Sequence, residues 1–264
     1  MDREELRETF NRTAARYHQA RPDYPPALYD ALMEAAQLER GDRALEVGPA
    51  TGKATIPLAR RGLVITAVEL GAELAREARR NTAGLPVAVV TGRFEDFALP
   101  EDAVLFDLVF AATSWHWIDP GIAYERAWRL LRPGGHLAFW SASHVIPDGG
   151  DRFFYEIQDV YDEIGEGLPT SYQWLRPGEL PDESDAIRNS GRFEPVLVRQ
   201  FDWELVYTAE AYIALLETFS GHMSMSSAQK ERLYGAVRER LAARPDPRLR
   251  RHWGACLHVA RRIP

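Results

Sequence analysis

The sequence predicts an α/β protein built around a doubly wound, mainly parallel sheet. From residue 44 onward, short apolar segments alternate with helical segments of roughly ten residues, which is typical of βαβ crossovers. A turn that contains glycines separates the first expected strand of this stretch from the first helix. Together these two observations place the expected ligand site at the carboxyl ends of the strands.

Two helices are expected before the first strand. The first carries a stripe of Leu6, Phe10, Ala14 and Tyr17, and the second begins at Pro26 and stops before Gly41. The expected strands of the core are Ala44–Val47, Val64–Val68, Val87–Thr91, Asp107–Ala111 and Leu137–Ser141. The expected helices between them are Ala54–Arg61, Ala72–Asn81 and one from Pro120 with Asp119 as its N-cap, and a turn is expected at Pro133-Gly134-Gly135.

Beyond Ala142 the alternation is lost in a segment rich in proline and glycine, with one helical run near residues 153–164. The later expected elements are a strand over Val196–Val206, a helix capped by Thr208, a helix opened by the capping box at Ser226–Gln229 and a last strand over Ala255–Ala260. We therefore divide a single domain into an N-terminal helical lid (1–40), a ligand-binding core (41–142), an inserted cap (143–195) and a segment that completes the sheet (196–264).

Composition and charge exclude several classes of function. The formal net charge is −7, so no overall positive field would hold a phosphate backbone, and we expect no nucleic-acid partner. Cys256 is the only cysteine, which excludes an intramolecular disulfide and a cysteine-based zinc site; we expect no metal. The polar, acidic start and the lack of a long apolar run predict a cytoplasmic protein without a membrane partner.

The glycine turn and a later acid predict a nucleoside site. Gly48 and Gly52 flank a turn that directly precedes a helix, and Glu69 ends the second strand, where an acidic side chain can accept hydrogen bonds from ribose hydroxyls. A tight turn without a ligand is the simpler alternative. A dinucleotide enzyme would also use Glu69, but its fingerprint needs glycine at the positions of Ala50 and Lys53, so a smaller nucleoside is favoured.

Five segments, in order and with suitable spacing, carry a specific resemblance over about residues 40–141. The segments are Ala44–Thr55, Val68-Glu69-Leu70, Gly92–Phe97, Phe106–Phe110 and Leu130–Gly135. They resemble the motifs of class I S-adenosylmethionine-dependent methyltransferases. This resemblance implies a seven-stranded Rossmann-like sheet, S-adenosylmethionine as cofactor and S-adenosylhomocysteine as product. The family usually has glycine where Ala50 stands.

The resemblance also implies roles for individual residues. Glu46 would orient the loop, and Gly48, Pro49, Ala50 and Gly52 would present backbone to the methionyl group. Glu69 would hold the ribose, Leu70, Phe94 and Glu95 would surround the adenine, and Ala112 would line the methionine side. Tyr17 and Arg21 would close over the cofactor as part of the lid, although a packed surface helix is equally consistent with their pattern.

A narrower likeness extends through most of the chain. Ala15-Arg16-Tyr17, Arg21–Pro25, Ser114–Trp117, Thr218–His222 and Val259–Arg262 are similar to a subgroup that includes trans-aconitate methyltransferases. This likeness implies a small-molecule acceptor with an oxygen nucleophile, either a carboxylate or a hydroxyl. A cofactor-binding regulator without activity and, less favoured, an NAD-dependent oxidoreductase are the alternatives.

The acceptor site is expected next to the fourth strand. Trp115, His116 and Trp117 follow that strand at its carboxyl end, where a tryptophan face could stabilise a sulfonium cation or simply plug the sheet. His116 is the candidate catalytic base, with substrate binding as its alternative role. Trp174 and His222 are further candidates for substrate contacts, against packing within the cap. The sequence predicts neither the acceptor nor the oligomeric state.

Overall fold

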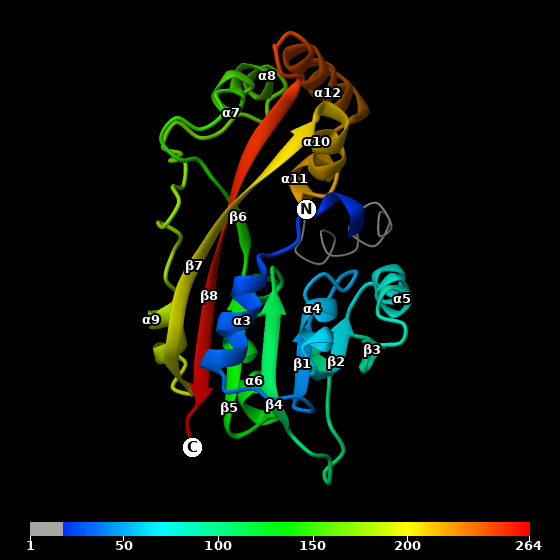
Figure 1. The fold of residues 1–264 in the computed structure, drawn as a ribbon, viewed down its shortest axis with the longest axis vertical. Helices are drawn as coiled ribbons and strands as arrows, with labels where there is room; N and C mark the ends of the chain where they lie inside the picture. Colours follow the sequence, from blue (N-terminus) through cyan, green and yellow to red (C-terminus); the bar gives the residue numbers. More distant parts are fainter. Residues whose placement is uncertain (1–17) are drawn as a thin grey trace.

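The computed structural model describes residues 18–264 and shows one twisted sheet with helices on both faces (Figure 1). The first expected helix, with the Leu6 to Tyr17 stripe, lies outside the described residues. The longest strands, β7 (Phe193–Thr208) and β8 (Arg248–Arg262), form a pair, and the parallel strands lie beside one half of it (Figure 1). The helices at the other end of this pair are α7 (Phe153–Glu156), α8 (Gln158–Glu163), α10 (Ala209–Leu216), α11 (Ser220–Ser224) and α12 (Ser227–Ala242).

Five parallel strands form the half of the sheet that carries the expected ligand site. In spatial order they are β3 (Val87–Thr91), β2 (Val64–Glu69), β1 (Arg43–Val47), β4 (Phe106–Ala112) and β5 (Leu131–Trp140). The order reverses at β1, which pairs with β2 on one side and with β4 on the other. Open α/β sheets bind their ligands at the carboxyl ends of the strands that flank such a point.

Three antiparallel strands complete the sheet: β6 (Ala142–Val145), β7 (Phe193–Thr208) and β8 (Arg248–Arg262). β5 and β6 pair with successive parts of β8, residues 258–261 and 252–255, and β7 pairs with β8 along its whole length. The sheet therefore has eight strands but seven positions across it, because β6 continues the line of β5 after Ser141. The expected seven-stranded, mainly parallel α/β fold is confirmed in this form.

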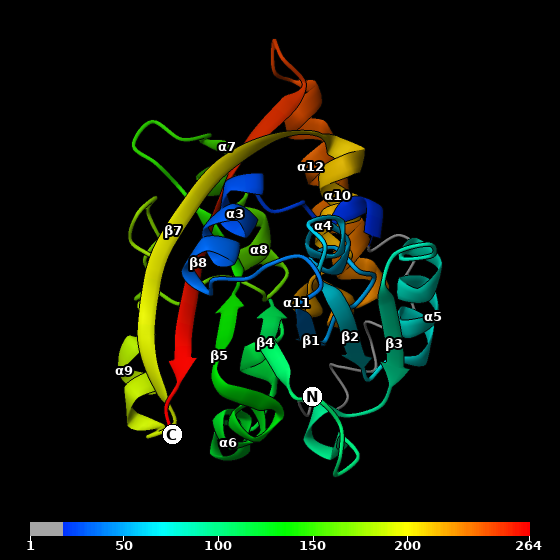
Figure 2. The same ribbon diagram turned by 60° about the horizontal axis from the view of Figure 1, so that its bottom comes forward.

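The helices pack their apolar faces against the sheet. α3 buries Leu28, Tyr29, Ala31 and Leu32, and it lies on the face of the sheet opposite α6 (Figure 2). The helices are α3 (Pro26–Ala35), α4 (Thr55–Arg60), α5 (Ala72–Asn81), η1 (Phe94–Asp96), η2 (Trp115–Trp117), α6 (Pro120–Leu130), α7 (Phe153–Glu156), α8 (Gln158–Glu163), α9 (Ser184–Asn189), α10 (Ala209–Leu216), α11 (Ser220–Ser224) and α12 (Ser227–Ala242).

Three expected helix caps are confirmed. Asp119 accepts a hydrogen bond from the Gly121 backbone at the start of α6, and Thr208 accepts one from Ala211 at the start of α10. Ser226 and Gln229 form both hydrogen bonds of a capping box on α12. Each cap satisfies backbone N–H groups that the first helical turn leaves without an intrahelical acceptor.

Two expectations from the sequence are wrong. The last strand runs from Arg248 to Arg262 rather than from Ala255 to Ala260, because its first half alternates arginines with apolar residues and still pairs with β7. Pro133-Gly134-Gly135, expected as a turn, lies within β5, where the pairing with β4 shifts register between Phe106 and Leu108. The irregular pairing accommodates the proline, which has no N–H to donate to a ladder.

Candidate functional site

A cavity of about 460 Å³ lies at the carboxyl ends of β1, β2 and β4. Its walls come from the turn after β1, the end of β2, η1, the segment from the end of β4 through η2, and the start of β6. Residues 21–24 and 219–220, far apart in the sequence, also line it. Its volume is within the range of ordinary small-molecule sites.

The turn after β1 brings backbone to the cavity. Gly48 and Ala50 have φ angles of +66° and +50°, in the left-handed region that glycine adopts without strain. A Cβ atom on Gly48 would lie 2.8 Å from the Cβ of Ser114, so glycine is required there for close packing as well as for conformation. Ala50 carries the strain that the family's usual glycine would avoid.

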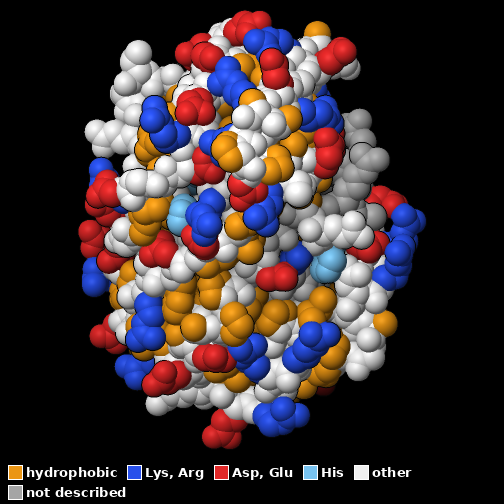
Figure 3. Space-filling view, turned by 45° about the horizontal axis from the view of Figure 1, so that its top comes forward, with side chains coloured by type: hydrophobic (Ala, Val, Ile, Leu, Met, Phe, Trp, Pro, Cys, Tyr) orange, Lys and Arg blue, Asp and Glu red, His pale blue; other side chains and the backbone are white. Residues whose placement is uncertain are grey.

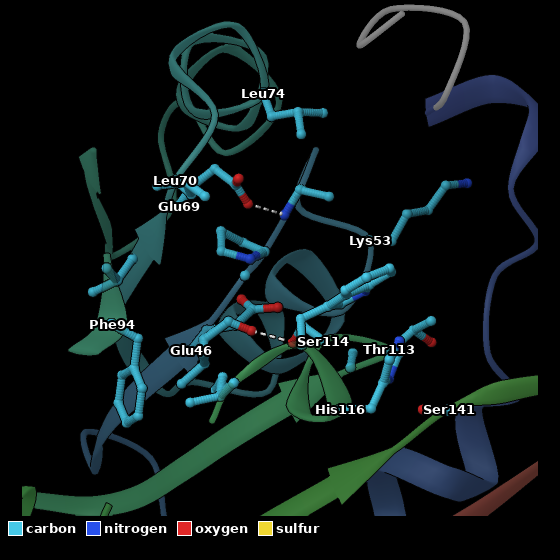
Figure 4. A pocket seen from close by; sticks show the side chains of 18 of the residues that line it. Glu46, Lys53, Glu69, Leu70, Leu74, Phe94, Thr113, Ser114, His116 and Ser141 are labelled. Atoms are coloured by element: carbon cyan, nitrogen blue, oxygen red, sulfur yellow. Dashed lines mark hydrogen bonds between the residues drawn. The ribbon is translucent and has the colours of Figure 1, made fainter. Parts of the chain in front are cut away.

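The Glu69 side chain stabilises this turn through hydrogen bonds to the backbone. Its two carboxylate oxygens accept hydrogen bonds from the backbone N–H groups of Ala50 and Gly71, at 2.9 Å each, and only 6% of the residue is exposed. Figure 4 shows the bond to Ala50 beside Leu70 at the edge of the cavity. Each oxygen has a second lone pair, so this clamp is compatible with a further donor from a ligand. The sequence did not reveal the clamping role.

Glu46 is a buried acid that lines the cavity. One carboxylate oxygen accepts a hydrogen bond from the Thr55 hydroxyl, whereas Oε1 has no hydrogen-bond partner among the described residues. Burial raises the pKa of Glu46 to about 8; the Thr55 hydrogen bond opposes the increase and the nearby Glu69 adds to it. A ligand that carries an ammonium group could satisfy the free oxygen and favour its charged form.

Most of the predicted cofactor residues meet at this cavity. Figure 4 shows Glu69, Leu70 and Phe94 on one side of it, and Thr113, His116 and Ser141 on the other. The predicted residues that line it are Glu46, Gly48, Pro49, Ala50, Glu69, Leu70, Phe94, Glu95 and Ala112. Gly52 does not line it; with a φ of +91° it shapes the turn into α4 instead.

The opposite side of the cavity is rich in hydroxyl groups. Thr113, Ser141, Ser143 and Ser220 line it together with Tyr24, whose hydroxyl lies 2.6 Å from the Thr113 hydroxyl. No signal in the sequence pointed to this set, because its members come from separate segments of the chain. The Thr113 backbone has a φ of +57° and its N–H donates to the Trp140 carbonyl, which holds the threonine at the end of β4.

The predicted acceptor residues divide into two groups. His116 and Trp117 line the cavity, and His116 is exposed. Trp115 does not line it: this residue is 8% exposed and stacks on Phe139 with ring centroids 5.5 Å apart, in the packing role that was its alternative.

Trp174 and His222 are also absent from the cavity lining. Trp174 packs edge-on against His144 and Tyr155, and His222 Nε2 lies 2.8 Å from the Tyr161 hydroxyl. Arg21 does line the cavity, and Tyr17 lies outside the described residues.

Two further observations concern the described residues as a whole. Within residues 18–264, no group of three or more histidine, cysteine or acidic side chains is arranged to hold a metal ion. No helix in the same range is both long and apolar enough to cross a membrane.

Comparisons with known proteins identify the kind of domain that contains this cavity. A family model for a methyltransferase domain matches residues 45–139, from β1 through most of β5. An uncharacterised methyltransferase of Mycobacterium bovis is 29% identical over 245 residues, which cover 92% of this chain and 89% of that protein. The malonyl-[acyl-carrier protein] O-methyltransferase of Enterobacter lignolyticus is 32% identical over 150 residues, which cover 56% of this chain and 58% of that enzyme.

Solved structures share the fold. A protein of Anaeromyxobacter dehalogenans, provisionally named a type II methyltransferase, superposes with a TM-score of 0.65 at 24% identity and covers 91% of this chain and 97% of its own. The [4+2]-cyclase SpnF has a TM-score of 0.51 at 20% identity, covering 92% and 83%. At such identities the likeness shows the fold alone. Residues 45–139 match a methyltransferase domain, and the relatives that align with most of the chain support an S-adenosylmethionine-dependent methyltransferase.

Proposed function

We propose that this methyltransferase acts on an oxygen nucleophile, a carboxylate or a hydroxyl, of a small-molecule acceptor. The observation that carries this proposal is the division of the cavity into two sides. One side offers the β1 turn and Glu69, and the other offers the hydroxyl groups of Tyr24, Thr113 and Ser143 beside His116. Hydroxyl groups can both donate to and accept from a polar acceptor.

The residues of the first side fit S-adenosylmethionine. Glu69 would accept from the ribose hydroxyls, Phe94 and Leu70 would pack against the adenine, and the free Oε1 of Glu46 would accept from the ammonium group. When bound, this cofactor supplies a methyl group on a sulfonium. The contribution of the chain is to hold the acceptor oxygen in line with that group, and positioning of this kind is worth up to roughly 7–11 kcal/mol.

His116 has two alternative tasks that depend on the acceptor. A carboxylate is ionised at neutral pH and needs no base, so His116 would bind it. A hydroxyl must lose its proton, and His116 would take it as a general base. We favour the binding role, because the exposed position of His116 suits contact with a solvated anion.

The charge of the chain supports a small acceptor rather than a nucleic acid. The net charge is −7, and on the face that Figure 3 shows, basic and acidic side chains are interspersed rather than gathered into a continuous basic surface. A phosphate backbone needs such a surface for affinity. The likeness to trans-aconitate methyltransferases remains a prediction about the acceptor.

The test is a screen of acceptors with mass spectrometry of the products. Small carboxylic acids, alcohols, amines and thiols are incubated with the protein and S-adenosylmethionine, and the methylated atom is identified by fragmentation. We expect methyl esters or ethers. Transfer only to nitrogen, sulfur or carbon would refute the oxygen acceptor, and the absence of turnover with cofactor bound would favour the regulatory alternative.

A further inference from the structure

A buried arginine lies next to Phe219, one of the residues that line the cavity. Arg251, on β8, is 7% exposed, and its guanidinium carbon lies 4.3 Å from the centroid of the Trp253 ring and 5.7 Å from that of Phe219. Arg21 approaches the same Phe219 ring at 4.4 Å. Arg21 and Phe219 both line the cavity and Arg251 does not, so Arg251 lies beside an aromatic ring of the cavity wall.

The charge of Arg251 is not balanced by an acid. No carboxylate among residues 18–264 forms an ion pair with it, whereas Arg244, in the same part of the molecule, pairs with Asp151 at 2.7 Å. The Nε atom of Arg251 is buried and has no hydrogen-bond partner in the described part of the chain. A buried charge without an opposite partner costs several kcal/mol, and faces of aromatic rings offset only part of this cost.

The polar groups around Arg251 can donate to an anion. The hydroxyls of Tyr161, Tyr207 and Tyr212 are the groups that interact with its charge. Burial, followed by the nearby guanidinium, lowers the pKa of His222 to about 4 and that of His144 to about 2, so both imidazoles are neutral at pH 7. Arg251 therefore supplies the positive charge, with neutral hydroxyl and imidazole groups beside the guanidinium.

We infer that Arg21 and Arg251 form an anion subsite at the end of the cavity, and that the methyl acceptor carries an anionic group, a carboxylate or a phosphate, that binds there. Arg21 is the outer guanidinium, and its Nη2 already donates to the Thr218 carbonyl at 2.7 Å. Arg251 is the inner one, reached when the Phe219 side chain moves aside. This inference rests on the proposed function, because it takes the hydroxyl-lined side of the cavity as the acceptor site.

The experiment measures anion binding to the full chain loaded with S-adenosylhomocysteine. Succinate and inorganic phosphate are titrated separately by calorimetry into the wild type and into Arg21→Gln, Arg251→Met and Arg251→Lys. The two probes distinguish a carboxylate from a phosphate. Arg61→Gln is the matched control, since Arg61 also lies over an aromatic ring, Tyr29 at 5.2 Å, but pairs with Asp30 away from the cavity.

We expect at least one anion to bind, and its affinity to fall by about tenfold or more in Arg21→Gln and Arg251→Met, the value of one charge-assisted hydrogen bond. Arg251→Lys should retain part of the affinity, and Arg61→Gln all of it. If Arg251→Met does not fold, Arg21→Gln and Arg251→Lys still decide the matter. Anion affinity that is absent in the wild type, or unchanged in Arg21→Gln, overturns the subsite. Failure of S-adenosylhomocysteine to bind the wild type would instead overturn the cofactor site.

Discussion

Replacing Glu46 with glutamine should make the protein more stable at alkaline pH. Glu46 is 1% exposed, and burial, opposed by the Thr55 hydrogen bond and reinforced by Glu69, raises its pKa from 4.5 to about 8. The folded protein therefore holds a proton on Glu46 that the unfolded chain releases as the pH rises above 4.5. Glutamine resembles the protonated form of glutamate, and its side-chain oxygen can still accept a hydrogen bond from the Thr55 hydroxyl.

The magnitude follows from linkage between proton binding and folding. A group whose pKa is raised on folding makes its full contribution to the free energy of unfolding below its unfolded pKa of 4.5. That contribution is lost as the pH rises toward 8. Each pKa unit corresponds to about 1.4 kcal/mol, so the free energy of unfolding of the wild type should fall by this order per pH unit in the window. A glutamine side chain does not titrate, so the advantage of Glu46→Gln over the wild type should grow to several kcal/mol.

Urea denaturation of both proteins between about pH 5 and about pH 9 measures this difference. The free energies of unfolding should nearly coincide at the acid end and diverge steadily as the pH rises. Glu34→Gln, which makes the same chemical change on the exposed side of α3, should follow the wild type. A constant difference between Glu46→Gln and the wild type across the window would mean that Glu46 is ionised in the folded protein.

Three further predictions concern the turn, the N-terminal segment and the acceptor side. Ala50→Gly should raise the free energy of unfolding by about 0.5–1 kcal/mol, because it relieves a φ of +50° at some cost in chain entropy; a lower melting temperature in calorimetry would refute this. Deleting residues 1–24 should leave a folded sheet with much reduced methyl transfer, since Arg21, Pro22 and Tyr24 line the cavity; turnover at the full rate would argue against a lid. With a carboxylate acceptor, His116→Gln should mainly raise KM, whereas loss of a limb near pH 6–7 and a fall in kcat of about a hundredfold would make His116 the base.

The local signals in the sequence were sufficient for four of the five parallel strands, whereas β5 begins at Leu131, six residues before its predicted start. α5 and β3 have the predicted bounds, β1 and β2 are one residue longer than predicted at one end, and β4 is one residue longer at each end. Each of these elements is short, and its apolar pattern and flanking turn residues lie within the same few positions. The predicted length of β8 was too short, because arginines in its first half interrupt the apolar run that is typical of a strand.

Most residues predicted to bind the cofactor line one cavity, because they occupy the turn after β1 and the segments at and after the ends of β2, β3 and β4. The acceptor side was not predictable, since it combines segments as distant as Tyr24 and Phe219, which meet only after the sheet has formed. Trp174 and His222 show why the sequence did not identify the acceptor side. Aromatic residues that pack against other side chains have the same sequence pattern as residues that bind a ligand. Likewise, the clamp that Glu69 forms on Ala50 depends on the folded turn.

Calorimetric titration of the protein with S-adenosylhomocysteine and, separately, with NAD tests the central claim most directly, namely that the β1 turn and Glu69 form a site for the S-adenosyl nucleoside. We expect S-adenosylhomocysteine to bind one site and NAD to show no comparable binding. Glu69→Ala should weaken the affinity by about 1.5–3 kcal/mol, roughly 10- to 150-fold, through loss of charge-assisted hydrogen bonds. Glu73→Ala, a change to a partly exposed acid in the first turn of α5, should leave the affinity unchanged. Binding of NAD without S-adenosylhomocysteine, or an unchanged affinity in Glu69→Ala, would contradict the assignment.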